Sequence, residues 1–182
     1  MNKLITIVLL VLSGCASQPS QVYPSSVRFF DYNSISESYT DMPTSARIDT
    51  GFHGEKYLMY ASDRYTFSNG SQNSFVLDIS KETGNQVISL IDKYLKWEGM
   101  AVKDGDEFDK EIGKAKEAIL GNTYEFSFHS GNKKHHYLSI SMCSVMCTSA
   151  GYLDKKNAIA LKNEISAFVT DTYHVADTSK YQ

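Results

Sequence analysis

Sulfur-containing side chains are concentrated in one short segment of the chain. Two methionines and two cysteines stand close together there, at Met142, Cys143, Met146 and Cys147. Thiolate and thioether ligands favour Cu(I), so this segment could hold a soft metal ion. Met142, however, continues the apolar alternation of the residues before it, and methionine commonly fills gaps in a core. We therefore keep a soft-metal site as an alternative hypothesis.

Cys143 and Cys147 also favour a disulfide, provided that the chain is exported to an oxidising compartment. In a straight strand their Cα atoms would lie about 13 Å apart, at about 3.3 Å per residue. A disulfide needs a Cα–Cα distance below about 7 Å, so the chain must bend between the two cysteines. Val145 is out of phase with the preceding alternation, which indicates such a bend. We predict a disulfide that holds the chain locally before the last helix.

Two histidines flank a predicted hairpin loop at residues 130–134. In that register His129 lies opposite His135 on the outer face, close enough for both imidazoles to bind one metal ion. Lys133 and Lys134 stand in the same loop, which favours the alternative of two solvated imidazoles. His136 is expected to be half-buried at the hairpin end.

The acidic cluster at residues 104–111 does not match a calcium-binding loop. Such a loop needs acidic residues at alternate positions, then Gly, then a distant Glu. We instead predict a solvated helix start that is capped by Asp106. The sequence contains no nucleophile-elbow motif and no phosphate-binding loop. These observations favour a binding protein over an enzyme.

The N-terminus has the three parts of an export signal. Lys3 supplies a positive charge, residues 4–12 are apolar except for Thr6, and Ser13 and Gly14 are the small residues of a cleavage site. The apolar stretch is shorter than the roughly 20 residues that a transmembrane helix needs. Residues 1–14 are therefore predicted to be a signal peptide.

The end of this signal, Leu12-Ser13-Gly14-Cys15, resembles the lipobox of bacterial lipoproteins. The resemblance covers these residues only, and it implies a diacylglycerol on the Cys15 thiol, cleavage before Cys15 and acylation of the new amine. Several acyl chains would hold the protein firmly, since each buried CH₂ contributes about 0.8 kcal/mol. In Gram-negative lipoproteins, an Asp directly after the lipidated Cys resembles an inner-membrane retention signal. This chain has Ala16 at that position instead. This implies the periplasmic face of the outer membrane, with the cell membrane as the alternative.

Length and charge limit the remaining possibilities. The chain has 182 residues and a net charge of −3, so it carries no general electrostatic attraction for nucleic acid. We predict a lipidated tether and leading loop over residues 15–50, one globular domain over 51–176, and a polar tail over 177–182. Within the leading segment, residues 27–32 favour an edge strand and residues 33–50 a loop.

The globular part combines the periodicities of strands and helices. One hairpin is predicted around Asn69-Gly70, with Tyr57, Met59 and Ala61 on its apolar face. A helix with apolar positions from 87 to 95 follows and weakens at Gly99, and a second helix is predicted over residues 106–119. A second hairpin then leads to a last helix. This helix is capped by Asp154, and its apolar stripe is Ala158, Leu161, Ile165 and Phe168.

These elements predict an α+β fold, in which an antiparallel sheet from two hairpins has helices packed on one face. The hairpins share a pattern: residues 65–68 resemble 124–127, and residues 77–80 resemble 138–141. A duplicated ββα unit is therefore a further hypothesis.

The sequence is best interpreted as a non-enzymatic envelope lipoprotein that binds a protein partner or serves as an accessory factor. One alternative is an immunity or exclusion lipoprotein that blocks a toxin or phage. The other is a periplasmic soft-metal-binding protein. Apart from the lipid on Cys15, and that metal ion in the alternative, no cofactor is expected.

Overall fold

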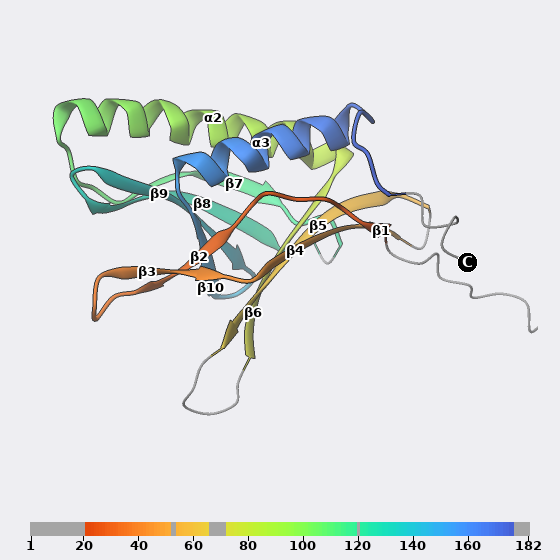
Figure 1. Ribbon diagram of the computed structural model, residues 1–182, viewed down its shortest axis with the longest axis horizontal. Helices are drawn as coiled ribbons and strands as arrows, with labels where there is room; N and C mark the ends of the chain where they lie inside the picture. Colours follow the sequence, from red (N-terminus) through yellow and green to blue (C-terminus); the bar gives the residue numbers. More distant parts are fainter. Residues whose placement is uncertain (1–20, 52–53, 66–71, 120, 177–182) are drawn as a thin grey trace, which may run out of the picture.

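The computed structural model describes residues 21–51, 54–65, 72–119 and 121–176, which form two antiparallel sheets and two helices (Figure 1). The first sheet has the spatial order β1 (Gln21–Val22), β4 (Thr44–Thr50), β5 (Lys56–Tyr65) and β6 (Gln72–Ser80). The second sheet has the order β3 (Ser38–Met42), β2 (Phe29–Asn33), β10 (Cys147–Leu153), β9 (His135–Cys143), β8 (Thr123–Asn132) and β7 (Lys110–Lys116). The predicted α+β class is confirmed, with the strands divided between two sheets.

Helices α2 (Lys81–Asp104) and α3 (Lys155–Val169) lie side by side on one side of the sheets (Figure 1). The apolar side chains between the helices and the strands are fully buried, including Phe29, Tyr60, Leu77, Ile91, Phe128, Leu138 and Phe168. Gly151 allows the sheets to approach each other, because a Cβ atom there would lie 2.7 Å from the Phe75 ring.

The helix ends follow local capping chemistry. Ser80 caps α2 through a capping box with Thr83, and Gly105 ends the helix in the left-handed conformation. Asp154 caps α3 by accepting from Asn157 N, and all four residues of the predicted stripe are buried, as the sequence indicated. Gly99 does not interrupt α2, since Glu98 and Ala101 keep the helix packed on both sides of it.

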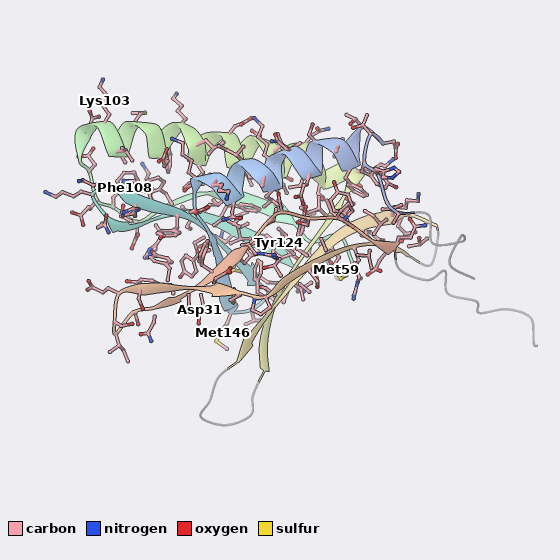
Figure 2. The ribbon with its side chains drawn as sticks, in the orientation of Figure 1. Asp31, Met59, Lys103, Phe108, Tyr124 and Met146 are labelled. Atoms are coloured by element: carbon pink, nitrogen blue, oxygen red, sulfur yellow. A yellow bond between two sulfur atoms is a disulfide. The ribbon has the colours of Figure 1, made fainter. Side chains whose placement is uncertain are left out.

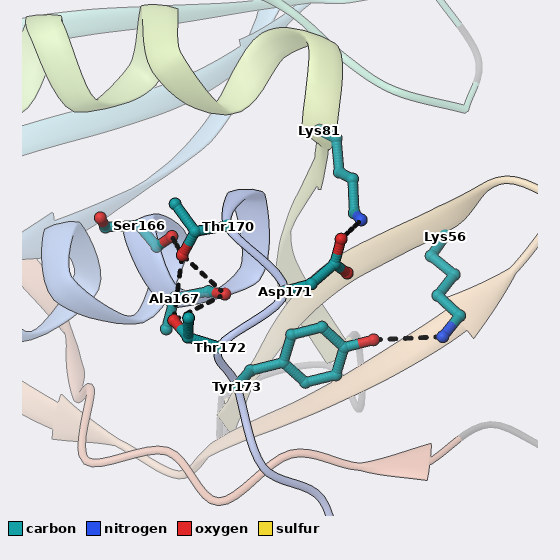
Figure 3. Close-up of polar contacts among 8 residues, drawn as sticks. All are labelled: Lys56, Lys81, Ser166, Ala167, Thr170, Asp171, Thr172 and Tyr173. Atoms are coloured by element: carbon teal, nitrogen blue, oxygen red, sulfur yellow. Dashed lines mark hydrogen bonds and ion pairs between the residues drawn. The ribbon is translucent and has the colours of Figure 1, made fainter.

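The segment after α3 is held against the neighbouring elements. Thr172 N donates to Ala167 O at 2.9 Å and Asp171 N donates to Phe168 O at 3.3 Å, as in a Schellman motif. Lys81 pairs with Asp171, and Lys56 Nζ lies 3.2 Å from Tyr173 Oη (Figure 3). These contacts fix the C-terminal end of α3 near the start of α2.

The helix predicted over residues 106–119 is wrong, because β7 occupies this region. Its pairing with β8 shifts between Glu111 and Gly113, so Ile112 is an extra residue in a β-bulge. Ile112 and Ala115 are therefore both buried although they stand three positions apart, a spacing that imitates a helix. Asp106 caps no helix; its N–H donates to Ala101 O at the end of α2.

The loop predicted over residues 33–50 is also wrong, since β3 and β4 occupy most of it. Ala46 and Ile48 of β4 are buried, and β3 pairs with β2 along its whole length. Consequently β2 lies inside the sheet, between β3 and β10, rather than at its edge. Within the described residues, strands are therefore already present from Gln21 onward, ahead of residue 51.

The apolar face of the first hairpin has the opposite parity in β5 from the predicted one. Leu58 and Tyr60 are fully buried and lie opposite Ile79 and Leu77, whereas Met59 and Ala61 are only partly buried. The turn at Asn69-Gly70 lies outside the described residues, as does most of the 65–68 segment. The predicted ββα order holds for β5-β6-α2, but β10 intervenes between β9 and α3.

Candidate functional site

The predicted disulfide joins Cys143 and Cys147. The chain bends at residues 144–146, where Ser144 N donates to Met146 O at 3.2 Å, and the two Cα atoms lie 3.9 Å apart. Glu125 lies beside the two sulfur atoms, but both thiols are used in the bond. Met146 is 80 % exposed at the turn, on the side of the sheets away from the helices (Figure 2). A thiolate metal site here would require reduction of the disulfide.

We expect the Cys143→Ala/Cys147→Ala variant to lose about 2 kcal/mol of unfolding free energy, the chain-entropy value for so short a loop. Urea denaturation of both proteins measures this difference. Adding a reductant should lower the stability of the wild type to that of the variant and leave the variant unchanged. Equal midpoints under oxidising conditions would contradict the prediction.

The register predicted for the two histidines is wrong. His129 lies opposite Tyr137 and His135 opposite Asn132, because residues 130–132 continue β8 through a bulge and the turn is shorter than predicted. Asn132 Oδ1 closes this turn by accepting from the N–H groups of Lys134 and His135. His129 Nδ1 instead lies 2.8 Å from Asp109 Oδ1, while His135 is exposed.

The outer face of the six-stranded sheet carries a cluster of aromatic side chains. Side chains alternate across a strand, so the burial of Phe29 and Phe128 on the helix side places Phe30 and His129 on the opposite side. We call this surface the tyrosine face and define it as Phe30, Tyr32, Tyr39, His129, Tyr137 and Tyr152. All six side chains are partly exposed.

Ring contacts hold the tyrosine face together across five strands, from β3 to β8. Tyr39 of β3 stacks on Tyr137 of β9 with ring centroids 3.5 Å apart, and Tyr32 of β2 lies 4.8 Å from Tyr39. The His129 ring meets Tyr32 edge-on at 4.7 Å. Such aromatic contacts restrict the side chains before any partner binds.

Two polar atoms of the tyrosine face are buried without a hydrogen-bond partner among the described residues. They are the Tyr39 hydroxyl and His129 Nε2. Burial raises the pKa of Tyr39 well above the usual tyrosine value and also raises the pKa of Tyr137, so both hydroxyls stay protonated and can donate at neutral pH. The sequence alone does not predict this surface, because residues 33–50 favour a loop and Tyr39 lies among them. The available signal is that Tyr32 and Tyr39 stand on either side of a turn-forming stretch that begins at Asn33.

A pocket of about 510 Å³ opens where α2, the start of α3 and the start of β9 meet. We call it the helix-end pocket; its lining residues are Glu98, Lys134, His135, His136, Tyr137, Asp154, Lys155, Lys156 and Ile159. His136 is buried, with 3 % of its surface exposed, rather than half-buried as predicted. Sequence reasoning assigned no role to Glu98 or Lys155, because helix and hairpin residues meet here only in the folded chain.

Hydrogen bonds and one ion pair fix the floor of the helix-end pocket. Buried Glu98 pairs with Lys155 Nζ at 2.7 Å. His136 Nδ1 lies 3.0 Å from Ser130 Oγ, which also accepts from Phe108 N at 2.9 Å. Ser130 therefore connects the His136 ring to the segment that carries Phe108, whose backbone N–H donates to the Ser130 oxygen.

Burial lowers the pKa of His136, against the opposing effect of the nearby Glu98 carboxylate. The imidazole is therefore neutral at neutral pH, and its Nε2 has no hydrogen-bond partner among the described residues.

No helix in the described part of the chain is long and apolar enough to cross a membrane. Comparisons with the profiles of known protein families, with curated proteins and with solved structures found no match for this chain.

Proposed function

We propose that this chain is an exported lipoprotein, anchored through Cys15, whose folded domain binds a protein of the cell envelope through the tyrosine face. The observation that carries the proposal is the aromatic cluster itself. Six partly exposed aromatic side chains lie on one sheet face, and two buried polar atoms among them lack partners within the described residues. The proposal concerns binding rather than catalysis.

The composition of the tyrosine face supports a protein as the ligand. Tyrosine is enriched in protein interfaces because its ring offers a large apolar area and its hydroxyl a hydrogen bond. The stacked Tyr39 and Tyr137 rings are already ordered, so binding loses little side-chain entropy. A partner that supplies groups to Tyr39 Oη and His129 Nε2 would satisfy both buried atoms.

The position of the anchor supports access to this face. The span from Cys15 to Gln21 reaches at most about 20 Å, at about 3.5 Å per residue. Strand β1 lies at one end of the long axis and the β2–β3 hairpin near the other (Figure 1). A lipid-anchored chain would therefore keep β1 near the membrane and present the tyrosine face away from it. We propose that the lipid anchor lies in the outer membrane, because Ala16 rather than Asp follows Cys15.

Site-specific photo-cross-linking in living cells tests the binding proposal. A benzoylphenylalanine at position 30 should give a discrete adduct whose second component is an envelope protein. The same probe at Val102, 44 % exposed on α2, is the control and should not give this adduct. Tyr39→Ala should reduce the adduct severalfold, since Tyr39 contacts four other residues of the face. The same band from both positions, or none from position 30, would overturn the proposal.

The anchor is tested separately by Cys15→Ser. The wild type should incorporate labelled palmitate and sediment with outer-membrane vesicles, and the variant should do neither. A wild-type N-terminus that begins at Met1 without added acyl mass would remove this part of the proposal and leave the cross-linking result unaffected.

A further inference from the structure

The helix-end pocket has the size and charge of a small-ligand site. Its volume of about 510 Å³ lies within the usual range of about 300–1,000 Å³ for ligand pockets. Three lysines and two carboxylates line it, which leaves a net charge of plus one when both histidines are neutral. Tyr137 and Ile159 supply apolar surface at its wall.

The two carboxylates of the pocket are already engaged. Glu98 pairs with Lys155, and Asp154 Oδ1 accepts from the backbone and side-chain N–H groups of Asn157. Lys134 and Lys156 have no carboxylate partner within the described ranges, and both are exposed. Uncompensated positive charge is therefore available at the pocket mouth.

The pocket floor carries a second, independent feature. Only 3 % of the His136 surface is exposed, and its Nδ1 is hydrogen-bonded to Ser130 Oγ. Its remaining nitrogen, Nε2, is on the far edge of the ring from Ser130 and has no partner within the described residues. A buried imidazole nitrogen without a partner costs free energy unless a ligand or water satisfies it. The N-terminus of α3 adds its dipole at the same place.

We propose that the helix-end pocket binds a phosphate group, held by Lys134, Lys156 and His136 Nε2. A phosphate offers several strong acceptor oxygens, so it can accept from two ammonium groups and an imidazole N–H together. The phosphate can belong to a small phosphate ester or to a phospholipid headgroup. This site is distinct from the tyrosine face, although Tyr137 lies at the border of both.

Isothermal titration of the full-length lipidated protein in detergent tests the site, with glycerol 3-phosphate as the first probe. Sodium chloride at equal ionic strength corrects for screening. We expect saturable binding that weakens at least about tenfold in Lys134→Gln/Lys156→Gln, since a charge-assisted hydrogen bond is worth about 1.5–3 kcal/mol. Lys103→Gln, an exposed change at the end of α2, is the matched control and should bind like the wild type (Figure 2).

Titration with short-chain, water-soluble phosphatidylglycerol and phosphatidylcholine, whose binding does not depend on the lipid anchor, separates the two sources of phosphate. Binding to phosphatidylglycerol that the double variant loses, without binding of glycerol 3-phosphate, assigns a lipid headgroup. Binding of the soluble ester assigns a small ligand. Imidazole ¹⁵N spectra give an independent readout: the bound probe should shift the His136 signal and leave exposed His174 unchanged. Absence of binding to both probes, or equal binding by the double variant, would overturn the proposal.

Discussion

Phe128→Ala is expected to lower the free energy of unfolding by about 3–5 kcal/mol, the usual cost of emptying a buried phenylalanine site. Phe128 is 0 % exposed and stacks on Phe108 with ring centroids 4.5 Å apart. Tyr94 and Trp97 of α2 lie at 5.8 and 6.3 Å from the same ring. The ring therefore joins the sheet, α2 and the segment before β7, and no neighbouring side chain can fill its place without moving another.

Urea denaturation followed by circular dichroism measures the effect of Phe128→Ala. Phe30→Ala is the matched control, because Phe30 is the same residue type on the partly exposed side of the same sheet. It should cost less than half as much. The His136 imidazole signal should also shift in Phe128→Ala, since the two rings lie 5.1 Å apart. A cost below about 1 kcal/mol would show that the core is not organised around Phe128.

Tyr124→Phe is expected to cost about 3 kcal/mol, since it removes two hydrogen bonds at a buried carboxyl group. The Tyr124 hydroxyl donates to Asp78 Oδ1 at 2.9 Å and accepts from Asp78 N at 3.1 Å. Ala118 N also donates to Asp78 Oδ1, at 3.1 Å. Tyr124 lies in the interior where the two sheets meet, so water cannot easily replace its hydroxyl (Figure 2).

The same pair makes stability depend on pH. Burial raises the pKa of Asp78, while the hydrogen bonds from Ala118 and Tyr124 lower it. Because the folded-state pKa lies above the unfolded value of 3.8, unfolding becomes easier as the pH rises from that value through the folded pKa. Tyr124→Phe should raise the pKa of Asp78 further and widen this pH range.

Denaturation at a series of pH values between 3 and 7 tests this coupling. Asp78→Asn keeps an acceptor but removes the charge, so it should remove the Asp78 contribution to the slope. Tyr94→Phe is the control for loss of a buried hydroxyl, because Tyr94 Oη donates to the neutral carbonyl of His136 at 2.8 Å. It should cost about 1 kcal/mol without changing the slope. A wild-type slope in Asp78→Asn would contradict the assignment.

Local chemistry made several elements predictable from the sequence. The cap at Asp154 and the stripe of α3 depend only on neighbouring residues and helical spacing, and both are confirmed. The alternation of residues along β6 likewise made the burial of Phe75, Leu77 and Ile79 on one face predictable. The disulfide followed from the required bend between Cys143 and Cys147.

Long-range pairing decided the elements that were predicted wrongly. The bulge at Ile112 gave β7 the spacing of a helix, and only its pairing with β8 shows that it is a strand. The turn after Asn132 shifted the β8–β9 register and separated His129 from His135. In both cases one extra residue changes which side chains face each other, and no local pattern reports it.

The sequence by itself determined the lipobox resemblance, the Asp154 cap, the disulfide and the α+β class, because each depends on residues close together in the chain. Only the tertiary structure decided the tyrosine face and the helix-end pocket. Tyr39 reaches Tyr137 across the sheet, and Glu98 reaches Lys155 from a different helix. Both surfaces are made by residues whose proximity follows from strand order and helix packing, which the local pattern does not contain.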